Sequence, residues 1–380
     1  MKTGSPLVEA QESTTSAGYS HLWQQLHAEG QVATNEAPVW LNPEPSAPWF
    51  IRLMLGIFGW LGGVFLMAFC GFFLIEHLQH EDVALLVMGL MLIGLACCIN
   101  RIGHAELWQQ LALALSLAGQ GMAGFWLFAT FGVDVAWPLF CIALFQCLLF
   151  VLNTDFLHRL LCVIISVLAS HIGFLMWLGP SPILPICAAL VALLWLDESY
   201  WQMRLRHAFL PIAAGLTVAL LCLALTSVWF PSWLLTQVAG AHRNDGLGDS
   251  LYRWLYLLDP VIIGIVFFEL VVRLSSALST AWRRVALTCG LVFAILGVWV
   301  VGLVLGGMLI LLGFARGRRW LVNLGIVASL CYLSWFYYSL DFTLLVKSIG
   351  LMVTGGLLLF GYFSLGYFSL SRLPAEIKNV

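Results

Sequence analysis

Long apolar stretches, separated by short polar turns, make up most of the chain beyond residue 50. Continuous stretches of about 20 apolar residues are typical of membrane-spanning helices, whereas the strands of a membrane barrel alternate apolar and polar positions over about ten residues. The stretches in this chain are continuous. The pattern therefore predicts an all-α polytopic helical membrane protein with spans at roughly 50–75, 83–99, 107–131, 135–152, 160–178, 182–196, 208–230, 255–272, 285–299, 301–315, 320–338 and 343–365.

The uncharged stretch from 285 to 315 decides how many spans there are. One helix of that length would be too long for a bilayer, and two helices would each be short. A single helix would also place Arg283 and Arg284 on the opposite side of the membrane from the basic cluster at 316–319. The charges therefore favour a tight hairpin that turns near residues 299–302, which gives about twelve spans within a range of about ten to twelve.

The basic residues give the expected orientation of these spans. Loops on the cytoplasmic side of membrane proteins carry an excess of Lys and Arg. If the N-terminus is cytoplasmic, the opposite side receives only Arg243 and Arg253, and Lys347 falls within a span. The cytoplasmic side receives Lys2, Arg52, Arg101, Arg159, Arg204, Arg206, Arg273, Arg283, Arg284, Arg316, Arg318, Arg319, Arg372 and Lys378. We therefore expect an inner (cytoplasmic) membrane protein with both termini in the cytoplasm.

The composition agrees with a membrane location. Hydrophobic residues make up 61% of the chain and charged residues 9%, whereas a soluble domain carries about 25% charged residues. The formal net charge is −2 and no basic stripe occurs, so nothing suggests nucleic-acid binding. All ten cysteines lie in apolar stretches without a C-x-x-C pair, which favours small apolar packing side chains over a disulfide framework.

The two ends and one loop differ from the apolar region. Residues 1–48 are expected to form a soluble polar leader, because no apolar stretch follows a basic start as in a signal peptide. Leucines at 22 and 26 suggest a short amphipathic helix, and a Pro-rich linker at 42–48 leads to the transmembrane domain at 49–370. Residues 371–380 would be a cytoplasmic tail. The one large external loop is expected at 231–254.

Two pairs of charged residues within or beside the spans are candidate functional groups. Lys347 lies inside the last span, and Asp341, six residues earlier, lies at its external turn. The lysine either extends its ammonium to the membrane interface or acts as a functional intramembrane charge. Glu269 precedes Arg273 by four residues, the favourable spacing for a local ion pair on a helix, although a proton relay is an alternative.

Uncharged polar residues form a second set of candidates. His171 lies in the middle of a span and needs a hydrogen-bond partner, which makes it a candidate proton or ligand site as well as a packing residue. Gln120 and Gln146 resemble the amides that join neighbouring membrane helices. His77 and His80, beside three acidic residues in the turn at 76–82, form at most a weak metal site.

No enzyme motif occurs in the sequence: a G-x-S-x-G elbow, an H-E-x-x-H helix and a P-loop are all absent. We therefore expect a protein that is not an enzyme and has no cofactor. The loop at 197–207, rich in Asp, Glu, Arg and His, resembles a boundary segment that meets anionic lipid headgroups.

The block at 311–360, with A-R-G-x-R-W, Y-Y-x-L and L-x-K-S, resembles a bacterial inner-membrane family known only as a domain of unknown function. The leader at 22–30, the P-W-x-x-R at 48–52 and the stretch at 111–122 are similar to the same family. The resemblance implies a shared pattern at Arg316, Arg318, Trp320, Tyr337, Tyr338 and Lys347. It also implies a companion, a second small membrane protein with a GDYxxLxY motif that this chain lacks, and it implies no activity.

The sequence supports two functions from different classes. The first is a non-enzymatic integral membrane subunit that forms a complex with the companion membrane protein. The alternative is a secondary transporter or channel-like protein for a small solute or proton, supported by the polar residues inside the spans. A membrane enzyme acting on lipid or glycan would need two ionisable side chains to converge at one interface, and the sequence does not identify such a pair.

Overall fold

The computed structural model describes residues 83–102, 106–133, 135–178, 181–229, 246–297 and 300–339, together with isolated positions at 23, between 54 and 69, and at 348 and 352. All regular secondary structure within these ranges is helical, which confirms the all-α prediction. The first and last expected spans, the leader, the C-terminal tail and the turn at 76–82 lie outside the described ranges.

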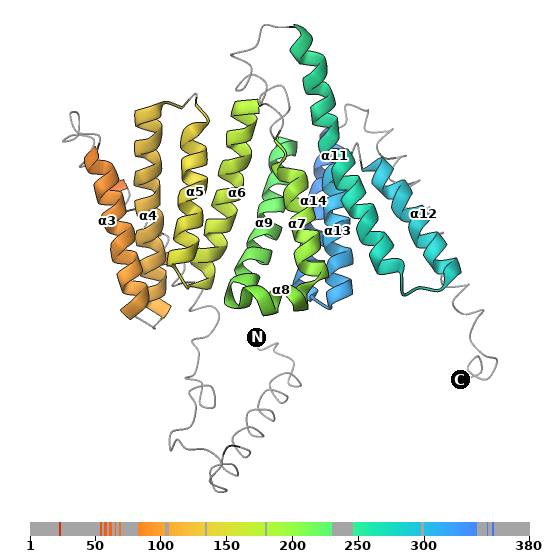
Figure 1. Ribbon diagram of the computed structural model, residues 1–380, viewed down its shortest axis with the longest axis horizontal. Helices are drawn as coiled ribbons and strands as arrows, with labels where there is room; N and C mark the ends of the chain where they lie inside the picture. The colour runs from red at the N-terminus through yellow and green to blue at the C-terminus, as the bar shows by residue number, and fades with distance from the viewer. Residues whose placement is uncertain are drawn as a thin grey trace.

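The helices stand side by side, and successive long helices run in opposite directions (Figure 1). The first four are α3 (Val83–Ile102), α4 (Glu106–Phe131), α5 (Trp137–Leu152) and α6 (Phe156–Leu178). They are followed by α7 (Ile183–Leu196), the short α8 (Glu198–Leu205), a 3₁₀ turn η2 (Arg206–Ala208) and α9 (Phe209–Trp229). The remaining helices are α11 (Gly246–Ser275), α12 (Thr280–Leu296), α13 (Val301–Arg316) and α14 (Arg319–Ser339). Each expected span between 83 and 338 therefore coincides with one helix.

Among the described residues, four stretches are long and apolar enough to cross a membrane: Val83–Arg101, Trp108–Phe131, Phe156–Leu178 and Glu198–Leu225, the last of which joins α8 to most of α9. The helices α5, α7 and α13 are apolar but shorter. A helix rises 1.5 Å per residue, so about 20 residues are needed to cross the apolar part of a bilayer. Length and composition together suggest a membrane protein.

The stretch from 285 to 315 forms two helices, as the charges predicted. The chain leaves α12 at Gly297 and enters α13 at Val301. The two helices do not pack mainly on each other, however, because α11 contacts both of them. Phe293 of α12 stacks on Phe267 of α11, with ring centroids 5.2 Å apart. The sequence predicted where the chain turns between α12 and α13, but not that α11 lies between these two helices.

The start of α11 corrects one prediction. The sequence placed an external loop at 231–254, with a surface segment before the span, but α11 is one continuous helix from residue 246 to residue 275 and contains Pro260. Figure 1 shows this helix rising beyond the upper ends of its neighbours. The polar residues of its first turns are compatible with a helix that extends out of the apolar layer, and polarity alone cannot distinguish such an extension from a loop.

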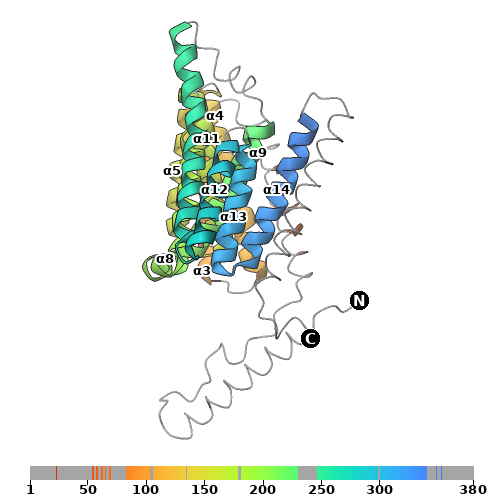
Figure 2. The same ribbon diagram turned by 90° about the vertical axis from the view of Figure 1, so that its right-hand side faces the viewer.

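The centre of the molecule is the contact between α7, α9, α11 and α13. Its largest fully buried side chains include Trp195, Phe209, Leu220, Leu270, Leu305 and Met308. The helix α14 lies at one face against α13, and α8 runs across the lower ends of the long helices (Figures 1 and 2). The helices α3 to α6 form the other part of the structure, joined to the centre mainly through α6 and α9.

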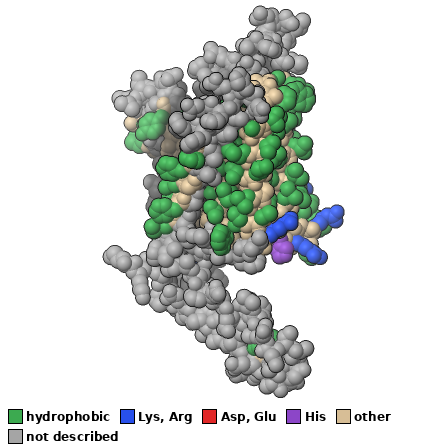
Figure 3. All heavy atoms as spheres, turned by 90° about the vertical axis from the view of Figure 1, so that its left-hand side faces the viewer, with side chains coloured by type: hydrophobic (Ala, Val, Ile, Leu, Met, Phe, Trp, Pro, Cys, Tyr) green, Lys and Arg blue, Asp and Glu red, His purple; other side chains and the backbone are tan. Residues whose placement is uncertain are grey.

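Arginines gather at one end of the bundle. The directions of the helices place the ends of α3, α11 and α13 and the starts of α6, α12 and α14 at the same level as α8. The arginines at these ends are Arg101, Arg159, Arg204, Arg206, Arg273, Arg283, Arg284, Arg316, Arg318 and Arg319. On the flank beside α3, hydrophobic side chains cover the described surface between the ends, and basic side chains gather below it (Figure 3).

In two helix pairs, a glycine of one helix lies directly against a glycine of the other. A Cβ atom added at Gly119 of α4 would overlap the carbonyl oxygen of Gly89 in α3. A Cβ atom added at Gly325 of α14 would lie 2.9 Å from the carbonyl oxygen of Gly306 in α13. Small residues allow the backbones of membrane helices to approach closely, and dispersion contacts then hold the pair together. The two hairpins therefore use the same packing device.

Replacing Gly119 by valine is expected to separate α3 from α4, because the obstructing atom belongs to the backbone and cannot rotate away. Overpacking of this kind costs about 1–3 kcal/mol or more. Gly94→Val in α3 is the matched control, since nothing lies within 4 Å of its added Cβ. Thermal denaturation in detergent, followed by size-exclusion chromatography, should show a lower midpoint for Gly119→Val alone. Equal midpoints for the two variants would contradict the close contact.

Candidate functional site: a buried polar network between four helices

Polar side chains from α4 and α5 meet inside the apolar group α3 to α6. Gln146 Nε2 of α5 donates a hydrogen bond to Gln120 Oε1 of α4 over 2.8 Å. Gln120 Nε2 in turn donates to Ser116 Oγ, one helical turn earlier, over 3.0 Å. Residues four apart lie on one face of a helix, so Ser116 and Gln120 both point toward α5 and α6. This is the upper part of a connected network.

The lower part of the network centres on His158 of α6. Its Nε2 lies 3.5 Å from Ser116 Oγ and 3.2 Å from Asn153 Nδ2. Asn153 Oδ1 accepts hydrogen bonds from Asn100 Nδ2 at 3.5 Å and from Cys97 Sγ at 3.7 Å. An amide nitrogen can only donate, so His158 Nε2 is the acceptor and the proton of the neutral imidazole lies on Nδ1.

The turn between α5 and α6 fixes the position of His158. Asp155 Oδ2 accepts the backbone N–H of His158 over 2.9 Å, as an N-cap side chain does at the third helical position. Asn153 Nδ2 also donates to the carbonyl oxygen of Leu149, and Arg159 Nε donates to the carbonyl oxygen of Asn153 over 2.6 Å. Local capping therefore holds the side chains of Asn153 and His158 in the bundle interior.

These side chains are buried and incompletely paired. Ser116, Gln146, Asn153 and His158 are each at most 3% exposed. Asn100 Oδ1, Gln146 Oε1 and His158 Nδ1 have no hydrogen-bond partner among the described residues. A buried polar atom without a partner costs about 1–3 kcal/mol in proteins, so its presence in an apolar bundle requires an explanation beyond packing.

A cavity of about 600 Å³ lies above the network, between α3, α4 and α5. Gln120 and Gln146 line it together with apolar side chains such as Leu86, Phe128 and Cys141. The network and the cavity are continuous, because the two glutamines belong to both. Among the described residues, no group of three or more His, Cys, Asp or Glu side chains has an arrangement that could hold a metal ion.

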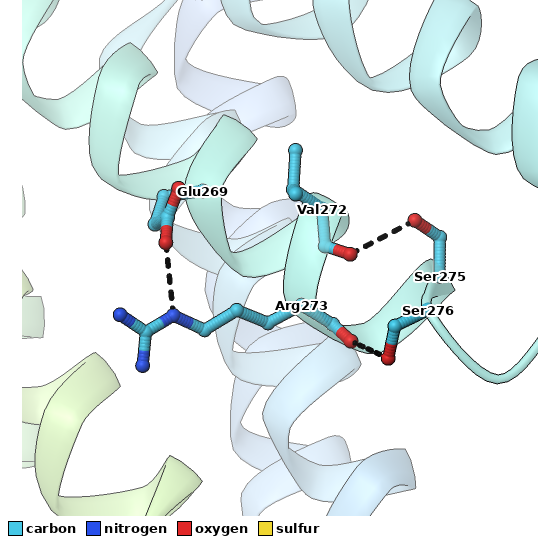
Figure 4. A network of polar contacts seen from close by, with 5 residues as sticks. All are labelled: Glu269, Val272, Arg273, Ser275 and Ser276. Atoms are coloured by element: carbon cyan, nitrogen blue, oxygen red, sulfur yellow. Dashed lines mark hydrogen bonds and ion pairs between the residues drawn. The ribbon is translucent and has the colours of Figure 1, made fainter.

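Glu269 and Arg273 form an ion pair on α11, away from the network (Figure 4). Arg273 Nε lies 2.9 Å from Glu269 Oε1, and the two side chains are 49% and 57% exposed. The hydroxyls of Ser275 and Ser276 donate to carbonyl oxygens at the end of the same helix. The arrangement is that of a local pair near a helix terminus, where exposure makes its contribution to stability small.

His171 lies on the same helix as His158 but does not join the network. Thirteen residues separate the two, which is about 20 Å along an α-helix. The Nδ1 atom of His171 has no partner among the described residues. Lys347 and Asp341, the charged candidates of the last span, lie outside the described residues.

The family-pattern residues lie near the Arg-rich end and on α14. Arg318 forms an ion pair with Glu198 at the start of α8, and Gln202 Nε2 donates to the same carboxylate over 2.7 Å. Trp320 packs edge-on against the buried Trp195, with ring centroids 5.4 Å apart. Arg316 is exposed, and the rings of Tyr337 and Tyr338 contact each other at 5.5 Å. Arg318 and Trp320 therefore attach the α13–α14 turn to α7 and α8.

Sequence reasoning missed His158, Asn153 and Ser116, and it interpreted Glu198 only as part of the charged boundary segment at 197–207. The predicted spans at 135–152 and 160–178 leave Asn153 and His158 in the connection between them. The Asp-x-x-His spacing at 155–158 indicates a helix cap and could have placed His158 inside the first turn. No local signal identifies Glu198 as the partner of Arg318, because 120 residues separate them.

Arg318→Met is expected to destabilise the protein by about 1–2 kcal/mol, because it leaves a largely buried carboxylate without its charged donor, although partial exposure of Arg318 screens the pair. Arg319→Met is the matched control, since the neighbouring side chain is exposed. The double variant Glu198→Gln/Arg318→Met should recover part of the loss. The unfolding midpoint in detergent is measured for the wild type, the two single variants and the double variant. No recovery in the double variant would argue against coupling between Glu198 and Arg318.

Comparison with known proteins gives a family but no activity. No curated protein and no solved structure is significantly similar to the chain. One family model, described as a domain of unknown function (DUF4401), matches residues 48–367. The match includes every long helix described above and the residues of the polar network. Because it covers most of the sequence, the chain belongs to the DUF4401 family.

Proposed function

We propose that this protein is a non-enzymatic polytopic membrane protein of the transporter or channel-like class, in which α3 to α6 handle a small solute or proton. The observation that carries the proposal is the continuity of the buried polar network with the cavity above it. An ionisable histidine inside apolar helices, linked through neutral hydrogen-bonding groups to a cavity, supports a solute or proton pathway.

The directions of the helices give this pathway a substantial depth. Asn153 and His158 lie at the Arg-rich end, where α5 ends and α6 begins. Gln120 lies near the middle of α4, and the cavity continues upward to Leu86 and Phe128, near the opposite end of the bundle. Network and cavity together therefore extend along most of the length of α4.

The unpaired atoms support a pathway over simple helix packing. Amides and hydroxyls that only join helices need no more than mutual hydrogen bonds, and each such bond contributes modestly in a membrane. Here three buried atoms, on Asn100, Gln146 and His158, have no partner among the described residues. A polar solute or water passing through the group would supply the missing hydrogen bonds.

The orientation rests on the arginines. The end of the bundle that carries them would face the cytoplasm of a bacterial inner membrane, because cytoplasmic connections are enriched in Lys and Arg. Both termini would then be cytoplasmic, with about twelve spans in the whole chain. Assembly with a companion membrane protein rests on the family resemblance and stays a prediction.

Removing the imidazole of His158 is expected to abolish transport-linked proton movement. In liposomes that hold a proton gradient and the dye pyranine, the wild-type protein should dissipate the gradient faster than empty liposomes do. His158→Leu should fall close to the rate of empty liposomes, because it removes the central acceptor of the network.

The matched control is His171→Leu, a histidine of the same helix outside the network, which should keep the wild-type rate. Size-exclusion chromatography verifies that both variants remain folded. A wild-type protein that never exceeds empty liposomes would refute proton conduction through α3 to α6, and equal losses in the two variants would refute the role of the network.

A further inference from the structure

We propose that α8 and the turn after it bind the headgroup of an anionic phospholipid at the Arg-rich end of the bundle. Arg204 and Arg206 would hold its phosphate, and His207 follows them in the turn η2. None of these residues belongs to the polar network between α3 and α6, so the lipid site is independent of the function proposed above. The direction of α8, the charge of its outer side and the backbone of Arg206 all point to it.

The helix α8 lies where the long helices end, and it runs across them instead of along them (Figure 1). Figure 2 shows it projecting from one flank of the bundle. In a bilayer crossed by the long helices, a helix in this position lies in the plane of the headgroups, at the level of the lipid phosphates. The exposed side of α8 is therefore placed beside lipid headgroups.

The inner side of α8 holds a carboxylate that is already paired. Glu198 is 8% exposed, forms an ion pair with Arg318 and accepts a hydrogen bond from Gln202 Nε2 over 2.7 Å. Trp201 and Leu205 of the same helix pack on the central core. Because Glu198 is neutralised by an arginine of another helix, it does not compete for the basic residues at the far end of α8.

The outer side of α8 carries positive charge without a counter-ion. Arg204, Arg206 and His207 are exposed, and the ion pairs among the described residues involve other arginines. Asp197, which is also exposed, precedes the helix and lies about 10 Å along its axis from Arg204. Figure 3 shows basic side chains and a histidine together at the lower end of one face. This charge complements a lipid phosphate, which guanidinium groups bind through paired N–H donors.

Apolar side chains beside the arginines favour a lipid over a free anion. Met203 is 75% exposed and Tyr200 53%, and Leu210 at the start of α9 is 42% exposed. Met203 adjoins Arg204 in the sequence, and Tyr200 precedes that arginine by one helical turn. A phospholipid supplies a phosphate for the guanidinium groups and an acyl chain for the apolar side chains, whereas free phosphate supplies only the charge.

The backbone of Arg206 is strained, which indicates that its side chain is needed at this position. Its φ is 48° and its ψ is −120°, and it is the one non-glycine residue with a positive φ among the described residues. Glycine adopts such a conformation readily, whereas a Cβ atom crowds the backbone. Strained residues of this kind cluster at ligand sites, so an arginine where glycine would fit better agrees with a binding role.

Native mass spectrometry of the full chain in detergent, titrated with phosphatidylglycerol or phosphatidylcholine, tests the lipid site. The wild type is expected to bind the first phosphatidylglycerol more tightly than phosphatidylcholine. One arginine beside an anionic headgroup contributes about fivefold in affinity. Arg204→Gln/Arg206→Gln should therefore weaken the binding of phosphatidylglycerol about 25-fold and leave that of phosphatidylcholine unchanged.

The matched control is Arg283→Gln/Arg284→Gln. These two arginines are exposed at the start of α12, at the same end of the bundle, so the control removes the same charge from another place. It should keep the wild-type affinity for phosphatidylglycerol. Equal losses in the two double variants would show that the lipid responds to the overall charge of this end, which would overturn the proposal.

Arg206→Gly separates the role of the side chain from that of the turn. It removes one guanidinium group and relieves the backbone, and this relief exceeds the entropy that a glycine loses on folding. The unfolding midpoint in detergent without added lipid should therefore rise, while the affinity for phosphatidylglycerol falls about fivefold. A lower midpoint with the same fall in affinity would mean that Arg206 stabilises the turn, and it would overturn its role in lipid binding.

Inorganic phosphate distinguishes a lipid from a free anion as the occupant. Added to the wild-type complex, it should leave phosphatidylglycerol bound, because it offers no acyl chain to Met203 and Leu210. Displacement of the lipid by phosphate would identify a site for free anions and overturn the proposal, as would unchanged lipid affinity in Arg204→Gln/Arg206→Gln.

Discussion

The structure depends on the cost of leaving a polar group unpaired where water is absent. That cost forces the backbone into helices, because each helix satisfies its own N–H and C=O groups, and the helices of this chain coincide with its apolar stretches. The same cost applies to side chains. The Thr217 hydroxyl donates to the carbonyl oxygen of Ala213, and Trp195 donates its indole N–H to Thr217 over 3.1 Å, so both of these polar side chains between α7 and α9 are paired. The polar network of α3 to α6 differs from that centre because its pairing is incomplete.

Close helix contact is the second condition for such a network, since polar side chains can bridge helices only when the backbones are near. Gly89 and Gly119 bring α3 and α4 together, and Gly306 and Gly325 do the same for α13 and α14. The two hairpins nevertheless differ in the contacts that this close approach allows. Ser116, one turn from Gly119, accepts a hydrogen bond from Gln120 of its own helix and contacts His158 of α6. Gly306 instead packs against Ser329 at the edge of the central core. Equivalent packing thus serves a polar network in one hairpin and an apolar core in the other.

The sequence predicted the helices well and the site only in part, for a physical reason. Apolar length and the alternation of arginines are local or one-dimensional properties, so they located the helices between 83 and 338 and the break between α12 and α13. Gln120 and Gln146 were recognisable as amides in apolar surroundings. The meeting of His158 with Ser116, or of Glu198 with Arg318, depends on how distant helices pack, and hydropathy carries no information about which faces meet. Polarity also failed at residues 246–254, where α11 extends beyond its neighbours as a helix.

The two histidines of α6 show why pairing, and not depth, marks the candidate site. By position His171 is the more central, and the sequence therefore favoured it. His158 lies nearer the Arg-rich end, yet its Nε2 contacts both Ser116 and Asn153, which connects it to side chains of four helices. A titratable ring can influence a solute only through groups that it contacts, directly or by a chain of hydrogen bonds. Because such a chain leads from His158 through Ser116 and Gln120 to Gln146 Nε2, and both glutamines line the cavity, a change at one end of the network has a physical route to the cavity at the other.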